Sequence, residues 1–184
     1  MNEEDRLVAV ASIGRRVTEI LAARWWRLQW ATFQEQFTAS LPEMLVEMEA
    51  AQTLAAGFGA EFVNGATPGA AARVRPGALA GVASDGRSLV KLLAQPMVQT
   101  FTAAARGAPQ VVALELGAQS LEQIVATQVE DAARGGEQVA MAANTKVSGY
   151  DRVVAGRVRQ VRHPGRPVLP LERRVPPASE VPVQ

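Results

Sequence analysis

The sequence predicts a mainly α-helical protein. We expect an elongated helical hairpin or bundle with a long C-terminal helix, then a small β-hairpin or an extended, basic, proline-rich arm. Three observations predict this. Apolar residues recur every three or four positions through most of residues 1–144, which is the period of an α-helix. The longest such run, residues 114–144, ends where the composition changes. Six prolines in residues 164–184 then preclude regular structure.

Charge divides the chain at the same place. Residues 1–144 carry 11 Lys or Arg and 15 Asp or Glu, whereas residues 145–184 carry 8 and 3. A length of 184 residues suits one domain plus a tail. We therefore expect a helical domain, residues 1–144, and a basic, proline-rich arm, residues 145–184.

The composition excludes several kinds of chemistry. The chain has no cysteine, which excludes disulfides, thiolate zinc sites and cysteine nucleophiles. His163 is the only histidine, and no nucleophile or acid is marked beside it. Gly57 and Gly59 follow no strand and precede no Gly-Lys-Ser/Thr, so they are a weak nucleotide signal. The sequence predicts a protein that is not an enzyme and uses no cofactor or metal. No apolar run approaches the roughly 20 residues that span a bilayer, so no membrane partner is expected.

The N-terminal part predicts two helices, over residues 5–37 and 41–63. Ser40 and Glu43 fit a capping box, and Pro42 suits the first turn of the second helix. A turn at residues 38–41 would then fold the pair into an antiparallel hairpin. Acidic residues 3–5 suit the positive end of the first helix dipole.

An aromatic row lies in the first predicted helix. Trp26, Trp30, Phe33 and Phe37 are spaced by four, three and four residues, so they share one helix face. Two interpretations remain: core packing, or an exposed docking face for another subunit, because tryptophan is enriched at interface hot spots. Base stacking is disfavoured, because only Arg24 and Arg27 lie near. The four aromatic residues and Tyr150 are the candidate partner-binding residues.

The middle of the chain predicts shorter elements. Residues 64–76 form a loop rich in glycine, alanine and proline, and Pro76 is suited to open a short helix that reaches Ala83. Asp85 is placed to cap a helix over residues 86–106. Pro96 removes one helical hydrogen bond, so this helix should kink or split there.

The long helix of residues 114–144 carries an apolar seam and two anomalies. Ser120 with Gln123 fits a second capping box, which predicts that the helix restarts after Gly117. Two interior glycines, Gly135 and Gly136, should cost about 1 kcal/mol each relative to alanine. They indicate either a bend or the close passage of another backbone. Both interpretations are favoured over a ligand-binding role. The predicted seam comprises Leu114, Leu121, Val125, Val129, Ala132, Val139 and Ala143.

Within the arm, β-branched residues alternate over residues 153–162, around a tight-turn signal at Ala155-Gly156. This pattern predicts a small hairpin or an extended segment. Its arginines suit forked contacts with phosphate or carboxylate. Three interpretations remain: contact with packaged DNA, contact with an acidic protein surface, or a solvated tail. The candidate phosphate-binding or acidic-partner residues are Arg152, Arg157, Arg159, Arg162, Arg166, Arg173 and Arg174.

The stretch from Ser120 to Val154 resembles the MuF-like minor capsid proteins of tailed phages, especially those of actinobacteria. In that family a helix with a TxVxDAxR centre runs into a GYxRV segment. The chain departs from the family after GYxRV, because the cysteine pair that usually follows is absent and only Arg162-His163-Pro164 echoes a later segment. Residues 50–63 and 77–96 also resemble the family. The matching residues are Thr127, Val129, Asp131, Ala132, Arg134, Gly149, Tyr150, Arg152 and Val153.

This resemblance implies a structural virion protein, a minor capsid component inside the phage head. Such a protein is made in the host cytoplasm, associates with the portal and assists head assembly or DNA delivery. The implied partners are the portal protein, the major capsid protein, further copies of the chain, and packaged DNA through the arm. The alternative is a small nucleic-acid-binding protein that uses its basic arm.

Overall fold

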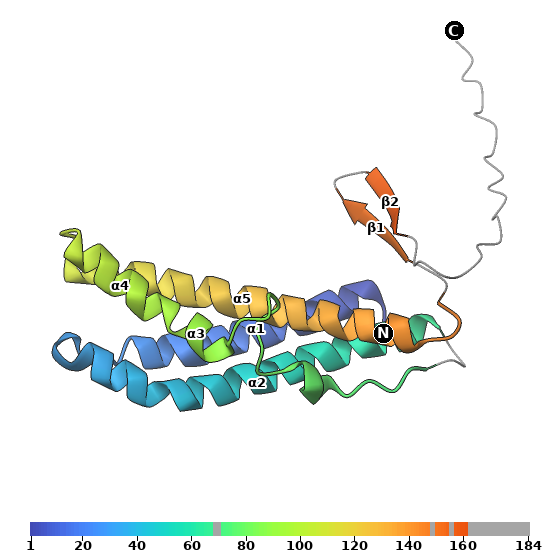
Figure 1. The fold of residues 1–184 in the computed structure, drawn as a ribbon, viewed down its shortest axis with the longest axis horizontal. Helices are drawn as coiled ribbons and strands as arrows, with labels where there is room; N and C mark the ends of the chain where they lie inside the picture. Colours follow the sequence, from blue (N-terminus) through green and yellow to red (C-terminus); the bar gives the residue numbers. More distant parts are fainter. Residues whose placement is uncertain (68–70, 148–149, 155–156, 162–184) are drawn as a thin grey trace, which may run out of the picture. The chain divides into compact units, whose positions relative to one another are not determined.

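The computed structural model describes residues 1–67, 71–147, 150–154 and 157–161. The chain forms two compact units, Met1–Lys146 and Val147–Gln184. The first unit is a helical bundle, which confirms the mainly α prediction (Figure 1). Its longer helices are α1 (Glu3–Trp25), α2 (Phe33–Ala66), α4 (Gln95–Ala105) and α5 (Gln110–Ala143). Its shorter helices are α3 (Leu89–Leu93) and two 3-10 helices, η1 (Trp30–Thr32) and η2 (Pro76–Leu79).

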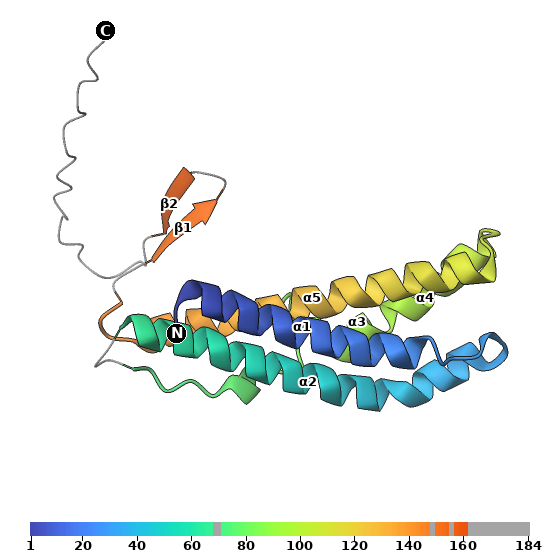
Figure 2. The same cartoon turned by 180° about the vertical axis from the view of Figure 1, so that it is seen from behind.

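Helix α5 is the common partner in this bundle, because α1, α2 and α4 all pack against it. Helices α1 and α2 form an antiparallel hairpin, and α4 runs antiparallel to α5 (Figures 1 and 2). Helices α2 and α5 therefore run in the same direction, and they share the most extensive helix contact. On α1 the buried residues Val10, Val17 and Leu21 recur every four or seven positions, so one face of the helix contributes to the core.

Helix α1 begins with a capping box. The backbone N–H of Asp5 donates to Asn2 Oδ1 at 2.7 Å, and the backbone N–H of Asn2 donates to Asp5 Oδ2 at 3.3 Å. Glu3, Glu4 and Asp5 occupy the first turn, as predicted. The box satisfies two amide groups that would otherwise have no partner at a helix start.

The predicted boundary between the first two helices is wrong. Helix α1 ends at Trp25, and α2 runs from Phe33 through the expected turn at residues 38–41. Ser40 does not cap a helix, because its hydroxyl donates to the carbonyl of Phe37 at 2.8 Å. Pro42 lies inside α2. A proline there costs about 3 kcal/mol, whereas each large apolar side chain that the earlier turn buries contributes about 1.5–3 kcal/mol.

The predicted split at Pro96 is confirmed. Helix α3 ends at Leu93, and α4 begins with Pro96 in its first turn. The predicted cap by Asp85 is wrong, because α3 begins only at Leu89 and Asp85 instead accepts from the backbone and side chain of Arg87 at 3.1 and 2.6 Å. Between them Gly86 has a φ of +81°, which interrupts any helix. The helix opened by Pro76 is a 3-10 helix that stops at Leu79.

Helix α5 is continuous, so the predicted restart at Ser120 is wrong. Gly117 is buried inside it, where a Cβ atom would lie 2.1 Å from Thr100 Oγ1 and 2.4 Å from Trp25 Cζ2. The predicted seam is buried at Leu121, Val125, Val129 and Ala132 but wrong at its end, where Val139 is 40% exposed and Ala143 is also exposed. A seven-residue step drifts around a 3.6-residue helix, so the contact face passes to Gly136 and Ala140.

The glycine pair in α5 marks a close approach of two helices. A Cβ on Gly136 would lie 2.0 Å from the carbonyl oxygen of Ala56 in α2. A Cβ on Gly59 of α2 would lie 2.0 Å from the carbonyl oxygen of Ala133. The expected close passage of another backbone is therefore confirmed for Gly136. Gly135 differs, because its Cβ would meet only the Leu79 side chain, at 3.9 Å.

The second unit contains two short antiparallel strands, β1 (Tyr150–Val154) and β2 (Arg157–Val161). Their register pairs Tyr150 with Val161 and Val154 with Arg157. The expected turn at residues 155–156 and the proline-rich stretch from Pro164 lie outside the described residues.

Candidate interaction surface

A cluster of aromatic rings fills the end of the bundle where α1 turns into α2. Trp25 lies at its centre and is 2% exposed. Phe33 and Phe37 meet the Trp25 ring edge to face, at centroid distances of 5.1 and 5.7 Å, which is a favoured geometry for aromatic pairs. The indole Nε1 donates to the carbonyl of Leu114 at 3.1 Å. These contacts join α1, α2 and α5.

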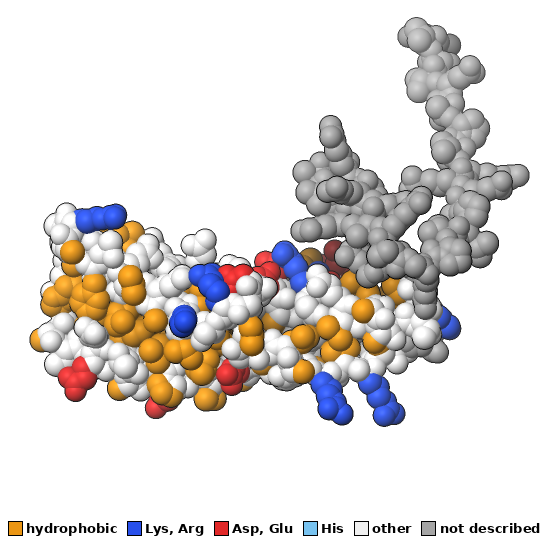
Figure 3. Space-filling view, in the orientation of Figure 1, with side chains coloured by type: hydrophobic (Ala, Val, Ile, Leu, Met, Phe, Trp, Pro, Cys, Tyr) orange, Lys and Arg blue, Asp and Glu red, His pale blue; other side chains and the backbone are white. Residues whose placement is uncertain are grey.

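The cluster continues to the molecular surface through Phe101 of α4. The Phe101 ring lies 5.7 Å from that of Phe33 and 6.0 Å from that of Trp30. Phe101 is 36% exposed and Val98, one helical turn away, is 58% exposed. We call Trp30, Val98 and Phe101 the aromatic end surface. Figure 3 shows hydrophobic side chains gathered over this end of the bundle.

The structure separates the four aromatic residues of the predicted row. Phe33 and Phe37 are buried in the core, so the core-packing interpretation is confirmed for these two residues. Trp26 is 52% exposed and Trp30 is half-buried. Trp25 is absent from the predicted row because that row requires one continuous helix. Helix α1 ends at Trp25, so the residues after it no longer share its helical phase. The spacing of the row could not include Phe101, because this residue lies in another helix and reaches Trp30 and Phe33 only through tertiary contact.

The remaining candidate residues belong to the second unit. Tyr150, Arg152, Arg157 and Arg159 lie in its strands, where Arg152 pairs with Arg159 in the register. His163 and the rest of the candidate arginines lie outside the described residues: Arg162, Arg166, Arg173 and Arg174. A phosphate-binding or acidic-partner site in the arm therefore stays a prediction.

The chain matches no protein-family model, no curated protein and no solved structure. Within the described ranges, no three of His, Cys, Asp and Glu lie together as metal ligands would. Nor is any helix in that part of the chain long and apolar enough to cross a bilayer.

Side-chain amides organise the opposite end of the bundle. Asn144, 3% exposed, donates through Nδ2 to Thr67 Oγ1 at 2.6 Å and accepts from the backbone N–H of Lys146 at 2.9 Å. Asn64 both donates to and accepts from the backbone of Ala72. These bonds tie the end of α5 to the end of α2, so residues up to Lys146 are anchored to the bundle.

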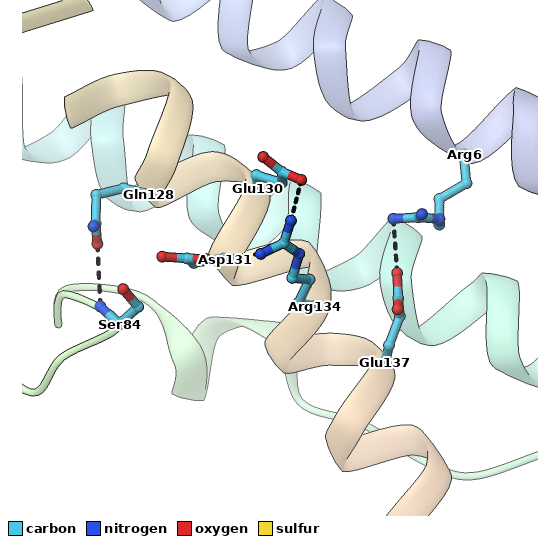
Figure 4. A network of polar contacts seen from close by, with 7 residues as sticks. All are labelled: Arg6, Ser84, Gln128, Glu130, Asp131, Arg134 and Glu137. Carbon is cyan, nitrogen blue, oxygen red and sulfur yellow. Dashed lines mark hydrogen bonds and ion pairs between the residues drawn. The ribbon is translucent and has the colours of Figure 1, made fainter. Parts of the chain in front are cut away.

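One ion pair at this end joins α1 to α5. Arg6 Nη1 lies 2.7 Å from Glu137 Oε1, and the side chains are only 13% and 19% exposed (Figure 4). Burial raises the pKa of the Glu137 carboxyl above its ordinary value of 4.5, although the charges of Arg6 and Arg134 lower it. The charge of Glu3 adds to the increase.

This direction of the pKa shift predicts how stability changes with pH. Above pH 4.5 and up to its raised pKa, folded Glu137 binds its proton more tightly than it does in the unfolded chain. The free energy of unfolding should therefore fall as pH rises through this window. Urea denaturation across pH 4–7 measures this, and Glu137→Gln should lose that part of the slope. An unchanged slope in the variant would contradict the assignment.

Proposed function

We propose that the protein is a structural virion component of the MuF-like type, a minor capsid protein inside a phage head. It would associate with the portal and assist head assembly or DNA delivery. The observation that carries this proposal is the resemblance of the stretch from Ser120 to Val154, which falls on α5 and β1. The bundle supports it with an exposed apolar surface at one end, as expected of a protein that binds other proteins.

Four of the five matching residues on α5 divide into two groups, and the fifth, Thr127, is exposed. Val129 and Ala132 are buried, so packing alone explains them. Asp131 and Arg134 lie on the outer side, where Arg134 Nη1 is 3.7 Å from Asp131 Oδ1 and Arg134 also pairs with Glu130 (Figure 4). Exposed ion pairs of this kind contribute only about 0–1 kcal/mol to stability. Stability therefore gives little reason for this polar pattern, and we propose that it contacts a neighbouring subunit.

We infer that the aromatic end surface is the docking contact for the portal protein. Trp30 and Phe101 offer large, rigid side chains of the type that dominates interface energetics. The helical domain has four more acidic than basic residues, whereas the arm has five more basic than acidic residues. The two parts are therefore suited to different partners: apolar protein contact for the bundle, and phosphate or acidic protein contact for the arm.

Capture of co-expressed portal and major capsid proteins by the tagged full chain tests the proposal. Binding to the portal should survive high salt, because apolar contact is not screened. Val98→Ser with Phe101→Ser should weaken capture about tenfold or more, as expected for hot-spot residues. Val46→Ser on α2 is the matched control, because Val46 is 64% exposed and lies outside the surface. No capture of portal by the unaltered chain would contradict the proposal.

A second function, nucleic-acid binding, is favoured by the net charge of +5 in residues 145–184. Duplex DNA added to the same capture experiment distinguishes it. DNA binding should disappear when residues 145–184 are removed and should fall with salt at a log–log slope of about −4 to −5. DNA capture of this kind, with no portal bound, would replace the minor capsid proposal.

A further inference from the structure

The first two turns of α1 have little apolar packing. Among residues 1–9 only Arg6 and Ala9 are even partly buried, whereas Leu7 and Val8 are 51% and 64% exposed. Val10 is the first buried residue of the helix. Apolar burial therefore holds α1 from Val10 onward, and something else must hold the turns before it.

Arg6 supplies the contact that holds these turns. Its guanidinium lies 2.7 Å from Glu137 Oε1 of α5 and 5.3 Å from the centroid of the Phe62 ring of α2. One side chain thus joins three helices. Figure 4 shows Arg6 reaching from α1 to Glu137, while Arg134 turns towards Glu130 and Asp131 instead.

This contact is poorly satisfied. Arg6 Nε is buried without a hydrogen-bond partner, and the 2.7 Å approach to Glu137 Oε1 is not aligned as a hydrogen bond. Taking both charges out of water is unfavourable, and only good hydrogen-bond geometry offsets it. The raised pKa of Glu137 has the same cause, because burial outweighs the attraction of Arg6. Such a contact separates at a low free energy.

Beneath these turns lies a small apolar cluster, separate from the main core. It consists of Ala60 and Val63 of α2 and Ala140 of α5, and Phe62 packs against it. A Cβ on Gly65 of α2 would lie 3.5 Å from the Met1 backbone nitrogen, so the start of the chain follows α2 closely here. Phe62 is half-buried, and separation of Arg6 from its ring would expose more of the ring to water.

We propose that residues 3–9 form a strap, closed over α2 and α5 by Arg6, that opens while the rest of the bundle stays folded. Opening breaks the Arg6–Glu137 and Arg6–Phe62 contacts and leaves the packing of Val10, Val17 and Leu21 in place. The strap gives the bundle two arrangements at this end, one with the Phe62 ring half-buried under Arg6 and one with more of the ring exposed.

Hydrogen exchange of the full chain tests the strap. Backbone amides of residues 6–10 should exchange at a rate that low concentrations of urea do not change, which marks local opening, while amides around Leu21 and Val125 should depend on urea. Arg6→Ala should speed exchange of residues 6–10 by about tenfold or more and leave the other amides unchanged. Arg15→Ala, at an exposed position of α1, is the matched control.

Two results would overturn the proposal. One is that residues 6–10 of the unaltered chain show the same urea dependence as the core amides, which would mean that they open only with the whole bundle. The other is that Arg6→Ala lowers protection equally in every helix. The first measurement needs no variant, so the proposal stays testable even if Arg6→Ala does not fold.

Discussion

Gly136→Ala should destabilise the bundle by about 3 kcal/mol or more, the upper part of the range for overpacked cores. The added Cβ would lie 2.0 Å from the Ala56 carbonyl oxygen and 2.7 Å from the Ala56 carbonyl carbon. Both atoms belong to the backbone of α2, so no side chain can rotate away. The helices must separate, which loosens the packing of small residues on both sides of the crossing.

Thermal denaturation measures this effect, and about 3 kcal/mol corresponds to a fall in Tm of about 10 °C for a domain of this size. Gly135→Ala is the matched control. Its Cβ would meet only the Leu79 side chain, at 3.9 Å, so the better helix propensity of alanine should raise stability by up to about 1 kcal/mol. Changes in stability of opposite sign at two adjacent glycines cannot come from helix propensity alone, because propensity would act alike at both. Equal effects would contradict the close crossing.

Trp25→Ala should have an effect of similar size, about 3–5 kcal/mol, which is typical of a buried tryptophan replaced by alanine. The side chain is 2% exposed, packs on Phe33 and Phe37, and donates to the carbonyl of Leu114. Its removal leaves a cavity at the junction of three helices, and the glycine at position 117 has no side chain to fill it.

The neighbouring tryptophan provides the control for this substitution. Trp26 is 52% exposed, so Trp26→Ala should change the free energy of unfolding by less than about 0.5 kcal/mol. Urea denaturation of the two variants separates the effects. If Trp26→Ala were the more destabilising, the phase of the C-terminal end of α1 would differ from that described here.

The sequence predicted what depends on local pattern. The period of apolar residues predicted the helical class, and Pro96 predicted the split between α3 and α4. The glycine pair predicted either a bend or a close backbone approach, and the structure shows the close approach at Gly136. Each of these signals acts within a few residues, so no knowledge of the folded chain was needed.

The errors came from long-range packing. Ser40 and Pro42 carry strong local signals for a helix start, but burial of Trp25 against Phe33 and Phe37 outweighs them and moves the turn forward. The aromatic end surface was likewise only partly visible, because Phe101 joins Trp30 through tertiary contact across 71 positions of sequence. The close approach of Gly59 to α5 could not be predicted either, because it depends on the Ala133 backbone, which is distant in the sequence.

The central position of α5 has a consequence for the order of events during synthesis. All the other long helices pack against α5, which is the last of them to be made. At about 5–20 residues per second, a ribosome needs about 2–7 s to add its 34 residues. During that interval α1, α2 and α4 lack their common partner, and the apolar surfaces that pack on α5 are open to water. The bundle is therefore completed late, and a chain interrupted before Gln110 would expose these faces to aggregation.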